Sequence, residues 1–154
     1  MGQTLIDLLF EEEGQIGYKA APPHSVAVWD QINRDAMELL ARPDYMVGSD
    51  SIPVGRFPHP RAYGTFPRLL GRLRRKIGNM SLEQMVQRVS DNPARTFGLK
   101  KRGRIEKGCY ADLVVFDTDR IMDNATYDDP CQFPTGIPYV LVNGQVAVDQ
   151  ERCT

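Results

Sequence analysis

The sequence is poor in the side chains that build metal and redox centres. Its 154 residues include only two histidines and three cysteines. His24 and His59 lie far apart and form neither an H-x-H nor an H-E-x-x-H pair, and no two cysteines form a C-x-x-C pair. A complete zinc site therefore cannot be assembled from this sequence. We expect the cysteines to be free thiols in a reducing compartment.

The sequence also lacks a long apolar run and a surplus of charge of one sign. No apolar stretch approaches the roughly 20 residues that a membrane helix needs, and the polar N-terminus does not fit a signal peptide. The formal net charge of -1 gives no general attraction to nucleic acid or anionic lipid. We therefore expect a cytoplasmic protein with neither nucleic acid nor a membrane as partner. Its 42% hydrophobic content suits one globular core.

The first hundred residues show the spacing of amphipathic helices. Helices are predicted at residues 5–13 and 25–41, followed by a short apolar strand at 45–48 and an irregular loop at 51–64. Thr65 would cap the next helix. The apolar face of that helix consists of Phe66, Leu69, Leu70, Leu73 and Ile77. A capping box at 81–84 opens a further helix, and Asn92-Pro93 would cap the last one, which Gly98 ends.

From about residue 101 the pattern changes to short strands. Strands are predicted at 104–105 and 111–117, and a hairpin at 137–148 around Asn143-Gly144. The single strand of the first half cannot cover its several helices, because each helix needs a sheet face. The predicted fold class is therefore α/β, with the first half as the C-terminal part of a larger (β/α)8 TIM-like barrel. A complete barrel takes about 250 residues, so the chain is predicted to be a fragment.

Asp50 is the first candidate for a chemical role. In an α/β barrel the active site gathers at the C-terminal ends of the strands, and Asp50 follows the predicted strand at 45–48. A carboxylate in that place can take up a proton and return it during hydrolysis. An aspartate after a strand also commonly caps a turn, and on spacing alone the turn cap is the simpler interpretation.

The second candidate is His59-Pro60-Arg61, in the loop just beyond Asp50. A guanidinium suits a planar carboxylate because it makes two parallel charge-assisted hydrogen bonds. Arg61 stands between Pro60 and the start of the next helix and is therefore expected near Asp50, although taken alone it is more simply a solvated surface arginine. A basic stretch follows at 68–76. Its Arg68, Arg72 and Arg75 are interpreted as a solvated helix face opposite the leucines, rather than as a nucleic-acid site.

Several motifs resemble a known enzyme family. The segment M-V-G-S-D at 46–50 and the run P-H-P-R-A-Y-G-T-F-P-R at 58–68 are similar to the C-terminal barrel segment of D-aminoacylases. These N-acyl-D-amino-acid deacylases belong to the amidohydrolase superfamily. The motifs at 103–108 and 111–117, with V-L-V-N-G at 140–144, resemble the passage of that superfamily from barrel to β-sandwich. The tail is shared widely by amidohydrolases, whereas the H-P-R run is narrower and indicates the deacylases.

The resemblance implies a metal-dependent hydrolase that cleaves the amide bond of a small-molecule N-acyl-D-amino acid. It implies that Asp50 is the catalytic general base and acid beside a zinc-bound hydroxide. Arg61 would bind the substrate α-carboxylate, with His59 beside it in the substrate-binding loop. The zinc of the full-length enzyme would be held by histidines and a cysteine from earlier barrel strands, and no segment here matches them. Residues 1–100 would be a barrel segment and 101–154 strands of the β-sandwich.

Two other functions stay open. One is a non-catalytic scaffold or binding module that keeps the tail of the fold. The other is a cyclic-amide hydrolase such as a hydantoinase or dihydroorotase, against which the H-P-R run argues. The isolated chain is expected to be inactive, and its macromolecular partner would be the missing barrel portion or a second copy in a homo-oligomer.

Overall fold

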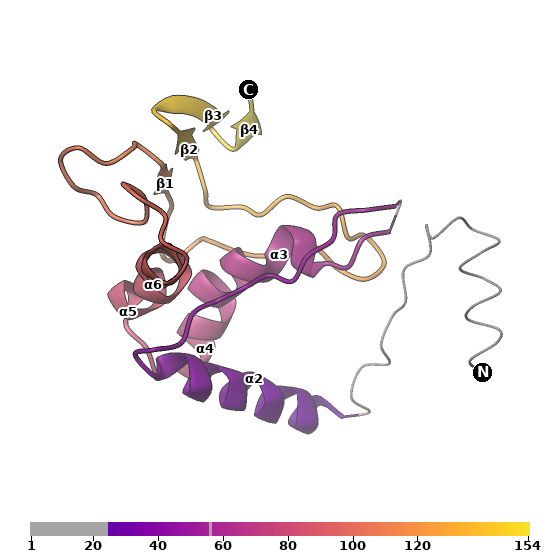
Figure 1. Ribbon diagram of the computed structural model, residues 1–154. Coiled ribbons are helices and arrows are strands. Elements are labelled where there is room, and N and C mark those ends of the chain that lie inside the picture. Colours follow the sequence, from indigo (N-terminus) through magenta and orange to yellow (C-terminus); the bar gives the residue numbers. More distant parts are fainter. Residues whose placement is uncertain (1–24, 56) are drawn as a thin grey trace, which may run out of the picture.

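The computed structural model describes residues 25–55 and 57–154, in which helices precede a small sheet (Figure 1). The first described helix is α2 (Val26–Ala41). Ser25 caps it, because the Ser25 hydroxyl accepts the Val28 N–H at 3.2 Å. The predicted helix at 25–41 is thus confirmed, whereas the one predicted at 5–13 lies outside the described residues.

The second helical run extends without a break through α3 (Arg61–Arg68), a π-helical turn η1 (Leu69–Leu73) and α4 (Arg74–Ile77). It ends at Gly78, whose φ of +70° is left-handed. The prediction that the loop lasts to residue 64 and that Thr65 is the cap was wrong. Pro60 stands at the cap position, where its fixed φ suits the first turn, and the Thr65 hydroxyl bonds back to the Arg61 carbonyl at 2.8 Å inside the helix.

A third helical run is formed by α5 (Leu82–Val86), a second π-helical turn η2 (Gln87–Asp91) and α6 (Asn92–Thr96). The predicted capping box is confirmed. Ser81 Oγ accepts the Gln84 N–H at 3.2 Å, and Gln84 Oε1 accepts the Ser81 N–H at 2.9 Å. Asn92 does not cap a separate helix as predicted, because the run passes through it.

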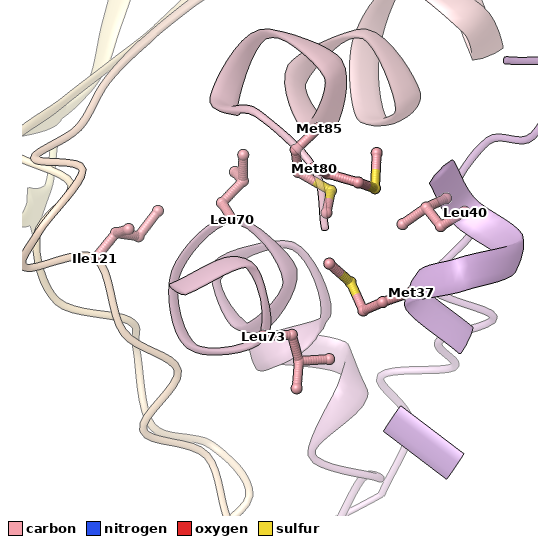
Figure 2. Close-up of a cluster of buried hydrophobic side chains, with 7 residues drawn as sticks. All are labelled: Met37, Leu40, Leu70, Leu73, Met80, Met85 and Ile121. Atoms are coloured by element: carbon pink, nitrogen blue, oxygen red, sulfur yellow. The ribbon is translucent and has the colours of Figure 1, made fainter. Parts of the chain in front are cut away.

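The core lies where these runs meet (Figure 2). The predicted apolar helix faces supply it, because α2, η1 and α5 each point one stripe inward. The cluster is completed from a later segment by Ile121, which is fully buried. Its members are Met37, Leu40, Leu70, Leu73, Met80, Met85 and Ile121.

The sheet is an antiparallel meander in the order β1-β2-β3-β4. Its strands are β1 (Leu113–Val115), β2 (Tyr139–Val142), β3 (Gln145–Asp149) and β4 (Arg152–Cys153). The predicted hairpin is confirmed. Both turn residues have positive φ, 53° at Asn143 and 80° at Gly144, as this type of two-residue hairpin turn requires.

Two predicted strands, at 104–105 and at 45–48, do not form. Residues 104–105 pair with nothing in the sheet. The strand predicted at 111–117 forms only in its middle, as β1. Residues 45–50 have no strand conformation either, because a strand needs a neighbouring strand and none of the described ones lies beside them. Their one backbone hydrogen bond with another segment joins Val47 N–H to the Arg88 carbonyl at 3.1 Å.

The described part of the chain is therefore a small α/β piece with helices on one side and a four-stranded sheet on the other (Figure 1). None of its helices is both long enough and apolar enough to cross a bilayer.

Candidate functional site

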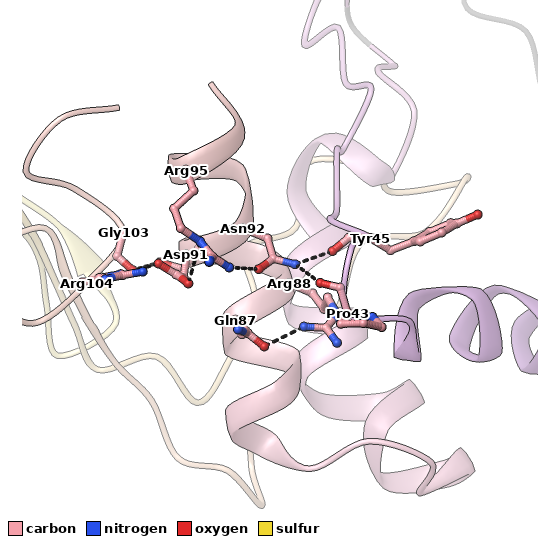
Figure 3. A network of polar contacts seen from close by, with 10 residues as sticks. Pro43, Tyr45, Gln87, Arg88, Asp91, Asn92, Arg95, Gly103 and Arg104 are labelled. Carbon is pink, nitrogen blue, oxygen red and sulfur yellow. Dashed lines mark hydrogen bonds and ion pairs between the residues drawn. The ribbon is translucent and has the colours of Figure 1, made fainter. Parts of the chain in front are cut away.

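The segment that leads to Asp50 is held by the third helical run, which lies beside it (Figure 3). Asn92 is 5% exposed, and its Nδ2 donates to the carbonyls of Pro43 at 2.8 Å and Tyr45 at 2.7 Å. Its Oδ1 accepts a hydrogen bond from Arg95 Nη2 at 2.9 Å. Because all these polar atoms are paired, Asn92 fixes the path of the backbone five residues before Asp50.

Arg88, one helical turn before Asn92, anchors the end of α2. Its side chain is 3% exposed, and its guanidinium donates to the carbonyls of Leu40 at 3.0 Å and Ala41 at 3.2 Å. A third bond, at 2.7 Å, goes to Gln87 Oε1. The last carbonyls of a helix have no partner within it and carry partial negative charge. The buried cation therefore stabilises the C-terminal end of α2, and no carboxylate among residues 25–55 and 57–154 pairs with it.

Asp50 lies at the end of this segment with a φ of 47°, in the left-handed region that aspartate tolerates better than most residues. Its side chain is 84% exposed, and its Oδ2 lies 3.2 Å from Arg61 Nη1, in the first turn of α3. The expectation that Arg61 lies near Asp50 is confirmed. A water-accessible carboxylate and a half-exposed guanidinium thus share one small region of the surface.

His59 links this region to a distant part of the chain. Its Nδ1 accepts the Arg61 backbone N–H at 3.1 Å, and its Nε2 lies 3.0 Å from the Tyr127 hydroxyl. The two rings meet edge to face, with centroids 5.1 Å apart. Burial lowers the pKa of His59 below its ordinary value, and the positive charge of Arg61 lowers it further. The imidazole is therefore neutral near pH 7.

The interpretation of Arg68, Arg72 and Arg75 as a solvated helix face was wrong. Arg72 Nε donates to the Asp123 carboxylate at 2.9 Å, and Arg68 Nη1 lies 3.4 Å from its other oxygen. Asp123 is only 6% exposed, and two cations compensate its burial. Arg75 donates to two backbone carbonyls, those of Thr118 and Ile121, both at 2.9 Å.

The described residues hold no cluster of three His, Cys, Asp or Glu side chains that could bind a metal ion. Three free cysteines lie within them: Cys109, which is partly buried, and Cys131 and Cys153, which are exposed.

Sequence reasoning missed four residues that hold the site: Arg88, Asn92, Asp123 and Tyr127. A signal existed for the first two. Arg88 and Asn92 follow Met85 at i+3 and i+7, on the apolar face of the helix, where a polar residue needs buried partners. No such periodicity marks Asp123 or Tyr127, since both stand in an irregular segment far along the chain from their partners.

Comparison with known proteins places these residues in a family. A model described as the amidohydrolase family matches residues 11–148. The chain belongs to the amidohydrolase family. This amidohydrolase is 38% identical over 152 residues to a D-aminoacylase of Alcaligenes xylosoxydans xylosoxydans, a match that covers 97% of the chain and 31% of the relative. It is 50% identical over 99 residues to an N-acyl-D-glutamate deacylase of the same organism, covering 64% and 20%. The chain thus spans under a third of the length of these relatives.

Two solved structures extend the likeness. A D-aminoacylase with a binuclear metal center superposes with a TM-score of 0.74 at 42% identity, over 78% of this chain and 25% of that one. An N-acyl-D-glutamate deacylase from Bordetella bronchiseptica superposes with a TM-score of 0.70 at 45% identity, over 77% and 24%. That enzyme is complexed with zinc and a phosphonate inhibitor that mimics the tetrahedral intermediate of its reaction.

Cyclic-amide hydrolases also match this amidohydrolase, but over a short stretch. A dihydroorotase of Lactobacillus helveticus is 51% identical over 39 residues, which is 25% of the chain and 9% of the relative.

Proposed function

We propose that this chain is the C-terminal part of a hydrolase that cleaves the amide bond of N-acyl-D-amino acids. In this proposal residues 1–100 form the last segment of a (β/α)8 barrel, and residues 101–154 add strands to a β-sandwich. The support is the near-full-length likeness to deacylases in sequence and in structure.

The observation that carries the proposal is the contact between Asp50 and Arg61, 3.2 Å apart. Hydrolysis of an N-acyl-amino acid needs a group that moves protons at the amide and a cation that binds the α-carboxylate. Asp50 and Arg61 have the two chemistries and lie within reach of one substrate of that size. A guanidinium binds a carboxylate through two parallel hydrogen bonds, which also fixes the orientation of the substrate.

Each residue then has a defined role. Asp50 accepts a proton from the water whose oxygen bonds to the acyl carbon, and it delivers that proton to the nitrogen as the C–N bond breaks. The products are a carboxylate and a free amino acid, and such proton transfer contributes typically 10² to 10⁴ in rate. Arg61 exchanges part of its contact with Asp50 for the α-carboxylate, which its half-exposed side chain permits.

The zinc held by the related deacylase has no matching ligand set in residues 25–55 and 57–154. The roles proposed for this chain are therefore confined to proton transfer and carboxylate binding. Zinc in the complete enzyme would need ligands from outside these residues.

The alternative with an observation in its favour is a cyclic-amide hydrolase, because dihydroorotases share a stretch of about 40 residues with the chain. That stretch covers about a quarter of the chain, whereas the D-aminoacylase match covers 97%. The broader match favours the deacylase.

The test compares the 154-residue chain with the polypeptide from the longest reading frame that contains it. Both are assayed for release of free amino acid from N-acetyl-D- and N-acetyl-L-amino acids, and for opening of hydantoin and dihydroorotate. We expect the longer polypeptide to prefer N-acetyl-D-amino acids and the short chain to be inactive. Preference for a cyclic amide would establish the alternative, and no hydrolysis by either would leave a non-catalytic binding role.

Variants in the longer polypeptide assign the roles. Asp50→Asn is expected to lower kcat by about 10² to 10⁴, since the amide cannot accept a proton. Arg61→Lys keeps the positive charge but loses the two parallel N–H groups that bind a carboxylate. It is therefore expected to raise KM with a smaller effect on kcat. The matched controls are Asp119→Asn and Arg120→Lys, which change exposed residues of the same types. Equal losses in the variants and the controls would contradict the assigned roles.

A further inference from the structure

The residues between 122 and 135 form a loop whose two ends are joined. Met122 and Thr135 exchange both backbone hydrogen bonds at 3.1 Å. From this base the loop, which we name the 122–135 loop, lies against α3 (Figure 1). A Cβ added to Gly64 would stand 3.4 Å from the Asp123 Cβ, so the helix backbone and the loop are in direct contact there.

Three further contacts fasten the 122–135 loop to the helix that carries Arg61. Buried Asp123 accepts hydrogen bonds from Arg72 and Arg68, as described above. Phe133 packs edge to face on Tyr63, with ring centroids 5.6 Å apart. Tyr127 contacts His59 at the very start of the helix. The loop is therefore rigidly placed at both ends of α3, and its tip reaches the candidate site.

The hydrogen bonds of His59 define its tautomer. Because Nδ1 accepts the Arg61 N–H, it carries no proton of its own. The proton of the neutral ring then lies on Nε2, which donates it to the Tyr127 hydroxyl oxygen. A hydrogen bond accepted at one ring nitrogen thus makes the other nitrogen the donor, which is the general way in which a protein selects a histidine tautomer.

We propose that Tyr127 is a positioning residue for Arg61, acting through the imidazole of His59. By accepting the Nε2 proton, Tyr127 holds the ring with Nδ1 turned toward the Arg61 N–H. That bond satisfies one of the free N–H groups of the first helical turn and fixes the backbone from which the guanidinium extends. Ordering this backbone before substrate arrives removes part of the entropic cost of binding the α-carboxylate. The inference rests on the proposed role of Arg61 in carboxylate binding.

The test variant is Tyr127→Phe, which keeps the ring but removes the hydroxyl that accepts the bond. Tyr63→Phe is the matched control, because it removes a hydroxyl at the same interface and keeps the ring contact with Phe133. Both are made in the polypeptide that shows hydrolysis, or in the 154-residue chain if neither does.

The first measurement is amide hydrogen exchange of the peptide that contains Arg61, followed by mass spectrometry. Tyr127→Phe is expected to speed exchange there roughly five- to tenfold, which matches the loss of one hydrogen bond, while Tyr63→Phe changes it less than twofold. Unchanged exchange in Tyr127→Phe, or equal acceleration in both variants, would overturn the proposal. This measurement does not depend on hydrolysis, so it still tests whether Tyr127 positions Arg61 through His59 if the proposed function fails.

The second measurement separates positioning from general loosening. For an N-acetyl-D-amino acid, Tyr127→Phe is expected to raise KM roughly five- to tenfold with kcat within twofold. For the matching N-acetyl amine, which has no α-carboxylate, kcat/KM should not change. Equal losses on the two substrates would show that the residue only supports the fold.

A double-mutant cycle tests the path through the ring. In His59→Asn the shorter amide can still accept the Arg61 N–H as an Asx turn, but it is too short to reach Tyr127. Adding Tyr127→Phe to this variant is expected to cause no further increase in exchange or KM. A further five- to tenfold increase in exchange or KM when Tyr127→Phe is added to His59→Asn would show that Tyr127 does not act through His59.

Discussion

Replacing Arg88 by methionine tests whether the hydrogen bonds from its buried guanidinium to backbone carbonyls hold α2 to the rest of the protein. Methionine keeps an unbranched apolar side chain in the core and removes the guanidinium. The carbonyls of Leu40 and Ala41 then lose their donors in a place from which water is excluded. The side chain of Gln87 loses its partner as well.

The size of the effect follows from two opposing contributions. Hydrogen bonds from a charged donor contribute about 1.5 to 3 kcal/mol each, so the two carbonyl bonds amount to at least about 3 kcal/mol. The folded variant no longer has to keep a charge away from water, which returns part of that loss. We therefore expect the free energy of unfolding to fall by about 2 to 3 kcal/mol. For a chain of this length that corresponds to a melting temperature lower by roughly 5 to 10 °C.

The assay is equilibrium unfolding in urea, followed by far-UV circular dichroism, with the slope of the transition compared between variants. Arg34→Met is the control, because Arg34 is an exposed arginine on α2 and its loss should change stability by less than about 0.5 kcal/mol. Arg88→Lys keeps the charge without the fork and is expected to fall between the two. If Arg88→Met proves as stable as Arg34→Met, the buried hydrogen bonds do not hold α2, and the reasoning is refuted.

Three further predictions concern packing and pH. Gly71→Ala is expected to destabilise the fold by about 1 to 3 kcal/mol in the same unfolding assay, because the new Cβ would lie 2.2 Å from the Ile121 carbonyl oxygen. The control is Gly48→Ala, which should be neutral because nothing lies within 4 Å of its new Cβ. Equal effects of the two substitutions would disprove the close approach at Gly71. Hydrogen bonds from the Asn143 N–H and, second, from Arg102 lower the pKa of Asp112. At pH values above the ordinary pKa of 3.8 this carboxylate therefore stabilises the hairpin in full. The stabilisation is lost as the pH falls through the lower pKa of the folded state. The protection of the hairpin amides, which is the intrinsic exchange rate at each pH divided by the observed rate, should therefore fall from pH 5 to pH 2 in the native protein and depend less on pH in Asp112→Asn; identical profiles would contradict this. The pKa of His59 is also lowered, so its contribution is complete above its ordinary value of 6.5 and is lost as the pH falls through the lower folded value. The protection of the Arg61 amide, taken relative to its intrinsic exchange rate at each pH, should therefore fall on acidification, and constant protection would argue against the bond to Nδ1.

The features predicted correctly from the sequence depend on neighbours within a few residues. The helix at 25–41, the Ser81 capping box and the Asn143-Gly144 turn each follow from local backbone chemistry, and each is present. The apolar stripe from Leu69 to Ile77 follows from helical spacing, and it supplies two residues to the core.

Two of the errors involve partners far away in the sequence. The segment at 45–50 has the composition of a strand, but its conformation depends on which strands lie beside it. The arginines at 68, 72 and 75 are regularly spaced, as on a solvated face, yet their acceptors stand 43 to 55 residues later. The start of α3 was misplaced because residues 61–64, which form its first turn, follow two closely spaced prolines and were taken as loop. At the candidate site, proximity of Asp50 and Arg61 followed from their short separation, whereas Tyr127 stands 68 residues from His59.

The basic helix uses two kinds of acceptor, which differ in what a substitution can remove. Arg75 is bound by the backbone carbonyls of Thr118 and Ile121, whereas Arg72 is bound by both the carboxylate and the backbone carbonyl of Asp123. A backbone carbonyl is present whatever the side chain, so the stretch at 118–121 keeps these bonds when the side chain of Thr118 is replaced. The carboxylate of Asp123 belongs to one side chain, and its bonds to Arg68 and Arg72 are lost with it. Tolerance of sequence change is therefore expected to be greater at position 118 than at position 123.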